Sequence, residues 1–237
     1  MERWKDFWQN YRVLEIKEDS DLLYQVGKTV MGKPISSIQY KAIITSIKEE
    51  LELNSEDNLC DLCCGNGIIT YDIASTVNKI IGIDSSVQFI ENARKYRSQH
   101  NIKYVCDDIL NANKYMFGED INKVILYDAI AYFSKNELIE VFNNIKNSSF
   151  KKIKIFIGSV LDKNRKFNYF NTLKRKMHYF INYIILRKDL GLGNWFSKKE
   201  LEKIALNCGY KIKFLNQNSI LHTAHYRFDA ILHINPD

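Results

Sequence analysis

From residue 58 onward, short apolar segments alternate with longer amphipathic ones. The apolar segments are rich in Ile and Val and have the length of strands, whereas the segments between them have the spacing of helices. This alternation predicts a parallel sheet that is covered on both faces. The predicted strands are 58–64, 79–84, 102–106, 122–127 and 152–160, and the predicted helices between them are 68–77, 87–100 and 135–147.

Two segments lie outside this alternation. Residues 1–50 are predicted to be helical, because Trp4, Phe7, Trp8 and Tyr11 share the face of one helix, and we expect them to form a helical lid over a site or to pack on the domain. Residues 162–195 are basic and aromatic. We predict that they form a helical insert after the fifth strand.

The end of the chain predicts one more helix and two more strands. Ser197 and Glu200 have the spacing of a capping box, so a helix is expected to begin there. The strands 211–215 and 226–234 are expected to pair as a hairpin. The prediction for residues 1–237 is therefore a single α/β domain with a doubly wound, seven-stranded, mostly parallel sheet and an antiparallel last strand.

The composition, 46% hydrophobic and 26% charged, is that of a globular chain. No apolar stretch is long enough for a membrane span and the N-terminus has no apolar signal core, so we expect a cytoplasmic location. Residues 151–188 hold eleven Lys or Arg and one acid, which is a charge of +10, while the rest of the chain carries −4. This basic stretch suggests an anionic partner, such as a phosphorylated substrate or RNA, or else a solvated helix face.

The turn after the first strand, at residues 61–67, is the main candidate for a ligand site. Its sequence is DLCCGNG, and glycines let the backbone approach a ligand closely. The helix that follows offers free N–H groups at its N-terminus. The spacing differs from G-x-G-x-x-G, so the turn predicts a nucleotide-like ligand but not a dinucleotide.

This turn resembles the first motif of the class I (Rossmann-like) S-adenosylmethionine (SAM) dependent methyltransferases, an acidic residue followed by x-G-x-G-x-G. Asp61 matches the acid, and Gly65 and Gly67 match the second and third glycines. Cys63 replaces the first glycine, which demands an ordinary φ there. The resemblance covers about residues 55–160 and, more loosely, the terminal hairpin. It implies SAM as the cofactor and S-adenosylhomocysteine (SAH) as the product.

The resemblance also implies cofactor contacts at the ends of the next strands. Asp84 would accept hydrogen bonds from both ribose hydroxyls. Asp107, or its neighbour Asp108 as the competing choice, would accept from the adenine amino group. The predicted cofactor-binding residues are Asp61, Cys63, Cys64, Gly65, Asn66, Gly67, Asp84, Ser85, Asp107, Asp108, Ile109, Tyr127 and Tyr132.

Several other chemistries are not favoured. The pair Cys60 and Cys63 lacks a second Cys or His pair at matching spacing, so we expect no metal site and expect Cys60 to point into the core. The only prolines are Pro34 and Pro236. The Pro-containing motifs of the family's amino-group and cytosine-C5 methylases are therefore missing.

Methyl transfer requires an aligned acceptor, and a hydroxyl acceptor also needs a base. The candidate bases are His222 and His225, which precede the last strand at the sheet edge expected to hold the cofactor. Arg227 would either hold an anionic substrate group or pair with Asp229, and we favour the pair. The candidate substrate-binding residues are Tyr24, Gln25, Lys28, Trp195, Tyr226 and Arg227.

The leading hypothesis is a small-molecule methyltransferase that acts on oxygen, because the two flanking segments resemble the lids of such enzymes. The expected acceptor is a small polar molecule, with a phosphorylated or nucleotide-linked sugar or polysaccharide precursor as the first choice. An RNA methyltransferase that uses the basic insert, or a SAM-binding partner subunit without activity, are the alternatives. Nucleic acid is the less favoured partner, and a monomer and a homodimer are both compatible with the sequence.

Overall fold

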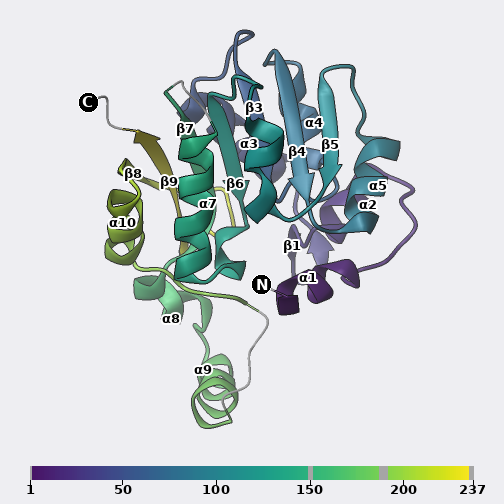
Figure 1. The fold of residues 1–237 in the computed structure, drawn as a ribbon. Helices are drawn as coiled ribbons and strands as arrows, with labels where there is room; N and C mark the ends of the chain where they lie inside the picture. The colour runs from purple at the N-terminus through teal and green to yellow at the C-terminus, as the bar shows by residue number, and fades with distance from the viewer. Residues whose placement is uncertain (1, 149–151, 187–191, 235–237) are drawn as a thin grey trace.

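The computed structural model describes residues 2–148, 152–186 and 192–234. Its centre is a seven-stranded sheet with the order β5-β4-β3-β6-β7-β9-β8 (Figure 1). Only β9 runs antiparallel to its two neighbours. The predicted doubly wound sheet with an antiparallel last strand is therefore confirmed. The strands are β3 (Asn58–Leu62), β4 (Lys79–Asp84), β5 (Ile102–Cys106), β6 (Lys123–Tyr127), β7 (Lys154–Leu161), β8 (Tyr210–Asn216) and β9 (Arg227–Ile234).

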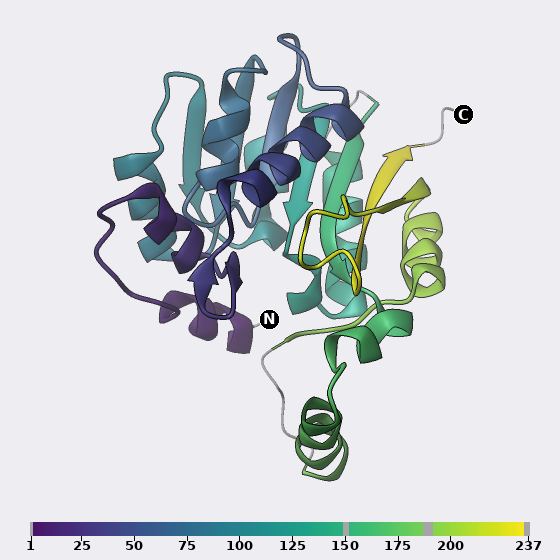
Figure 2. The same cartoon turned by 180° about the vertical axis from the view of Figure 1, so that it is seen from behind.

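Helices cover both faces of this sheet, as Figures 1 and 2 show from opposite sides. One face packs against α6 (Asn113–Met116), α7 (Lys135–Asn147) and α10 (Lys198–Asn207). The other face packs against α2 (Asp19–Gln25), α3 (Ser37–Leu51) and α4 (Ile68–Ala74). A third, smaller cluster joins α5 (Val87–Tyr96) to β5.

The central strand β3 shows why the sheet needs both layers. Leu59 packs into the α3 and α4 side, whereas Cys60 and Leu62 pack into the α7 and α10 side, and all three are fully buried. Strands buried on both faces carry apolar residues at successive positions rather than at alternate ones. Cys60 therefore points into the core as expected, and burial raises the pKa of its thiol.

The flanking segments are more structured than the sequence predicted. The N-terminal segment contains α1 (Glu2–Gln9), α2 and α3, and also a short hairpin of β1 (Thr29–Val30) and β2 (Lys33–Pro34) that the hydrophobic pattern did not reveal. Helix α10 begins at the predicted capping box of Ser197. The insert after β7 forms α8 (Lys166–Tyr169), α9 (Leu173–Tyr179) and a π-helical turn, η4 (Phe180–Ile185).

The turn between β3 and α4 is fixed by close packing as well as by backbone conformation. Gly67 is the N-cap of α4 and has a φ of +74°. A Cβ placed there would lie 2.4 Å from Oη of the buried Tyr104. The position therefore excludes any side chain and holds the start of α4 against β5.

We predict that Gly67→Ala destabilises the fold by about 1–3 kcal/mol more than Gly118→Ala does. Both glycines have a similar positive φ, so both variants carry the same backbone strain, but nothing lies within 4 Å of a Cβ at Gly118. Urea unfolding of both variants measures the difference. Equal losses would show that the turn has room for a side chain.

Candidate functional site

A pocket lies at the carboxyl ends of the central strands and is covered by the N-terminal segment. In open α/β sheets this edge is where ligands bind. The sheet side contributes Asp61, Cys63, Cys64, Gly65, Asp84, Ser85, Asp108, Ile109, Tyr127, Asp128, Tyr132 and Arg227, among others. The N-terminal side contributes Trp4, Lys5, Trp8, Tyr11, Val26, Gly27 and Lys28.

The loop after β3 is held from behind by two buried contacts. Thr70 on α4 donates a 2.6 Å hydrogen bond to Asp61, whose pKa is raised to about 7 by burial. Asn66 donates to the carbonyl of Leu22 and to Oε1 of Gln25, both at 2.9 Å. Asn66 and Gln25 are fully buried and do not line the pocket. They position the loop, so the predicted direct ligand contacts of these two side chains are not seen.

Cys63 corrects one expectation. Its φ is +59°, so the position of the missing first glycine still has a left-handed backbone and not the ordinary φ that a cysteine was expected to require. Asp128, which lines the pocket, and Ser159, which does not, also have positive φ values. Cys63 follows β3, Asp128 follows β6, and Ser159 lies within β7. Strained backbone conformations of this kind cluster at active sites and ligand-binding sites.

Asp84 at the end of β4 is oriented by the backbone around it. Its Oδ2 accepts from the N–H of Gly65 and its Oδ1 accepts from the N–H of Ser86, both at 2.9 Å. Burial raises the pKa of this carboxyl. Each oxygen keeps a second lone pair, and the side chain lines the pocket, so Asp84 can accept two more hydrogen bonds from a ligand.

The two acids after β5 have different roles. Asp107 accepts from Tyr115 at 2.6 Å and from Asn111 at 2.9 Å, and these hydrogen bonds lower its pKa. It does not line the pocket. Asp108 does line the pocket and forms an ion pair with Lys5 of α1. The structure therefore places Asp108, not Asp107, where a ligand would be met.

Helix α1 closes this side of the pocket with aromatic rings. Trp4 and Trp8 lie 4.8 and 5.3 Å from the ring of Tyr132, and Gln9 donates to the carbonyl of Ser85 at 2.6 Å. Of the four aromatic residues that predicted the helix, Trp4, Trp8 and Tyr11 line the pocket, whereas Phe7 is exposed. Tyr132 lines the pocket as predicted.

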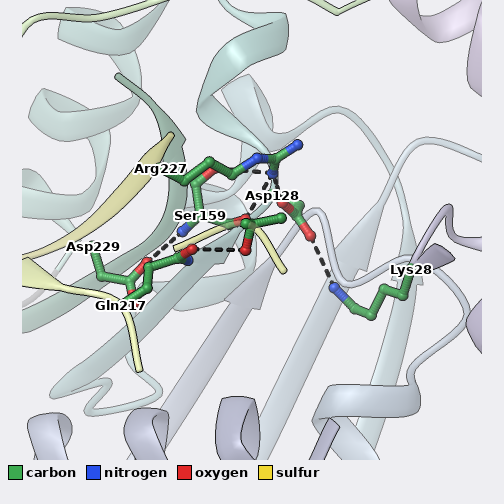
Figure 3. Close-up of polar contacts among 7 residues, drawn as sticks. Lys28, Asp128, Ser159, Gln217, Arg227 and Asp229 are labelled. Carbon is green, nitrogen blue, oxygen red and sulfur yellow. Dashed lines mark hydrogen bonds and ion pairs between the residues drawn. The ribbon is translucent and has the colours of Figure 1, made fainter. Parts of the chain in front are cut away.

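The opposite end of the pocket contains a charged network (Figure 3). Asp128 receives an ion pair from Lys28 at 3.0 Å and another from Nη1 of Arg227. The same Nη1 donates to Oγ of Ser159 at 2.7 Å and to its carbonyl at 3.2 Å. Burial raises the pKa of Asp128, but the two cations outweigh it and hold the pKa at about 2.

This network corrects the expected pair of Arg227 with Asp229. Asp229 instead accepts from the N–H of Ser159 at 2.6 Å and from Gln217 at 2.9 Å. The cause is a register shift between β7 and β9 at Ser159, which turns this N–H toward Asp229 and the hydroxyl toward Arg227. Arg227 is thereby directed into the pocket, and its buried Nε has no hydrogen-bond partner among the described residues.

The other predicted substrate residues do not line this pocket. Tyr24 lies under the guanidinium of Arg12, and Trp195 and Tyr226 pack around Tyr169. His225 is exposed, and Asn168 donates to its carbonyl. His222 is half-buried, and burial together with the charge of Arg227 lowers its pKa.

Sequence reasoning missed the pocket contacts of Lys5, Trp8 and Asp128. The aromatic spacing of residues 4–11 was visible, but nothing in it showed which surface the helix covers. Asp128 follows directly on Tyr127, at the carboxyl end of β6, and its place at that strand end was the available signal. The described residues contain no group of three or more potential metal ligands.

Both the sequence and the fold of this chain are similar to those of known proteins. Residues 59–149 match the profile of a family described as methyltransferase domain. The structure resembles magnesium protoporphyrin IX methyltransferase from Synechocystis with bound SAH, at a TM-score of 0.61 and 12% identity over 98% of this chain and 94% of that one. Residues 59–149 thus match a methyltransferase domain, and the fold around them is that of the class I SAM-dependent methyltransferases.

Two curated relatives match parts of this chain. One is a 23S rRNA (uracil(1939)-C(5))-methyltransferase of Pasteurella multocida, 32% identical over 32% of this chain and 16% of the relative. The other is a demethylmenaquinone methyltransferase of Staphylococcus saprophyticus, 28% identical over 40% of this chain and 45% of the relative. The matched part is thus less than half the length of either relative.

The residues that line the pocket fit SAM. Gly65 has a φ of +57°, and a Cβ there would lie 3.0 Å from the Val26 side chain, a tight contact, so a glycine backbone forms the wall there. Asp84 has acceptor capacity for two hydroxyls at one side of this wall. Asp108 and Ile109 lie beyond it toward β5, and Tyr127 and Asp128 lie toward β6.

We predict that Asp84→Ala weakens SAM binding by about 100-fold or more, because two hydrogen bonds to a charged group each contribute about 1.5–3 kcal/mol. Titration calorimetry with SAM and SAH measures the affinity. Asp107→Asn is the matched control, since this neighbouring strand-end acid does not line the pocket, and its affinity should stay within about threefold. Equal losses in the two variants would contradict the assignment of the ligand contacts.

Proposed function

We propose that this chain transfers the methyl group of SAM to an oxygen of a small polar acceptor that carries an anionic group. SAM supplies the electrophilic methyl group. In the proposal, Asp84 holds the ribose, Asp108 takes the adenine side that was first assigned to Asp107, and Tyr127 and Lys28 border the methionine end. The acceptor then occupies the part of the pocket beside Arg227.

The observation that carries this proposal is the state of the Arg227 side chain. Its contacts to Asp128 and Ser159 all use Nη1, whereas its buried Nε has no partner among the described residues. A guanidinium can bind a carboxylate or phosphate through two parallel N–H groups. Since leaving a buried donor unpaired is costly, the Nε edge favours an anionic ligand.

The position of Arg227 assigns this anion to the acceptor in our proposal. Arg227 begins β9, which lies beyond β6 and β7, whereas Asp84 and the glycine turn lie at β4 and β3. The proposed ribose site and Arg227 are therefore at opposite ends of the pocket. A phosphorylated or nucleotide-linked sugar or polysaccharide precursor would supply both the anionic group and a hydroxyl to methylate.

Of the two candidate bases, His222 is the one we retain. Its pKa is lowered by burial and by Arg227, so it is neutral and able to accept a proton at neutral pH. The charges of both Arg227 and Asp128 act on it, which supports a role at the acceptor end, although its side chain does not line the pocket. His225 is exposed and is retained as the control.

We predict that Arg227→Gln raises the KM for the acceptor by about tenfold or more while changing the Kd of SAM by less than about threefold. Turnover is measured as SAH formation with a pool of phosphorylated and nucleotide-linked sugars, and SAM binding by calorimetry. A loss of SAM affinity instead would assign the guanidinium to the carboxylate of the cofactor. Absence of SAH with every acceptor, despite tight SAM binding, would favour a SAM-binding subunit without activity.

We predict that kcat/KM falls as pH drops through the lowered pKa of His222, which lies below the ordinary value of 6.5, because only the neutral imidazole accepts a proton. His222→Asn should remove this acid limb and reduce kcat by about 10²–10⁴-fold at pH 7.5. His225→Asn should keep both the acid limb of the pH profile and the wild-type kcat. Persistence of the limb in His222→Asn would exclude His222 as the base.

A further inference from the structure

The insert after β7 extends away from the rest of the molecule. Figures 1 and 2 both show α9 projecting from the edge of the domain, below α8. We call residues 163–186 the arm. It contains α8, α9 and η4, and it holds six Lys or Arg and no Asp or Glu. The arm therefore carries +6, which equals the net charge of the whole chain, so the other residues sum to zero.

Tyrosines on one face of α9 and η4 pack on one another and on the end of α8, and Lys166 joins this cluster to Trp195. The ring of Tyr179 lies 4.6 Å from that of Phe170 and 5.1 Å from that of Tyr183. Nζ of Lys166 lies 5.3 Å from the Tyr179 ring and 5.2 Å from the Trp195 ring. These contacts fix which side of α9 and η4 is turned toward the protein.

A second face of the same helix is apolar and exposed. Leu173, Met177, Phe180 and Ile184 follow one another at steps of four, three and four, which places them on one side of a helix. The exposed fraction is 77% for Leu173 and about half for the other three. Tyr179 and Tyr183 lie to one side of these four residues, and Tyr183 is itself 46% exposed. We call these four residues the apolar stripe.

Basic residues border the apolar stripe on both sides. At 100° per residue, Lys174 lies to one side of Leu173 and Lys176 to the other, with Arg175 on the far side. All three are exposed. An apolar face between lysines is the pattern of a helix that lies in the plane of a membrane interface. No helix of the described residues is long and apolar enough to cross a membrane.

We propose that the arm binds an anionic membrane surface, with the apolar stripe inserted at the level of the headgroups and Lys174 and Lys176 on the lipid phosphates. Charge selects this partner over a second copy of the chain, because two arms of the same strong positive charge would repel each other. It also favours lipid over RNA, since exposed aliphatic residues gain nothing from a phosphate backbone. The proposal concerns location and does not depend on the acceptor.

The test is co-sedimentation of the full chain with vesicles of phosphatidylcholine alone or mixed with phosphatidylserine. We expect binding only to the mixed vesicles, and we expect salt to weaken it. The double variant Phe180→Ser/Ile184→Ser removes half of the stripe and should weaken binding by roughly tenfold or more. The double variant Lys174→Gln/Lys176→Gln should weaken it by roughly tenfold through charge alone.

The matched control is Leu206→Ser, which removes an exposed leucine on α10 and should bind like the wild-type chain. SAM affinity confirms that each variant is folded, because the arm does not line the cofactor pocket. Equal vesicle binding by the stripe variant and the control would overturn the proposal. A dimer in sedimentation velocity that is lost only in the stripe variant would also overturn the proposal. Tight RNA binding without vesicle binding would overturn it as well.

Discussion

The carboxylate of Asp128 joins the three parts of the chain that meet at the pocket. It follows β6 in a left-handed backbone conformation, and it accepts from Lys28 of the N-terminal segment and from Arg227 of β9. The two partners are about one hundred residues away on either side. Without this anion, two cations would face each other across the pocket wall, and the N-terminal segment would lose its ion pair to the sheet edge.

Polar contacts hold the N-terminal segment over the pocket at both ends. Lys28 pairs with Asp128 at one end, and at the other Lys5 pairs with Asp108 and Gln9 donates to the Ser85 carbonyl. Trp4 and Trp8 pack on Tyr132, and the Trp8 carbonyl accepts a 3.5 Å hydrogen bond from Oγ of Ser86. Ion pairs and hydrogen bonds, as well as aromatic packing, therefore fix the cover to the strand ends.

Much of this site could be predicted because strand ends are visible in the sequence. The strand 79–84 was placed with both ends correct, and its last residue, Asp84, is at the pocket. The choice between Asp107 and Asp108 could not be made in this way, because the turn after β5 decides which carboxylate faces the ligand. The partners of Arg227 were equally hidden, since they depend on a one-residue irregularity in β7 opposite β9.

The arm and the pocket are linked through the residues around Tyr226. Tyr169 of α8 packs on Tyr226 and Trp195, and Tyr226 directly precedes Arg227. Any surface that the arm binds would therefore lie on the side of the molecule where Arg227 is held. The charge distribution acts in the same sense, because the arm carries +6 and the rest of the chain sums to zero. An anionic surface attracts the arm more than the rest of the molecule, which orients the molecule with the arm toward that surface.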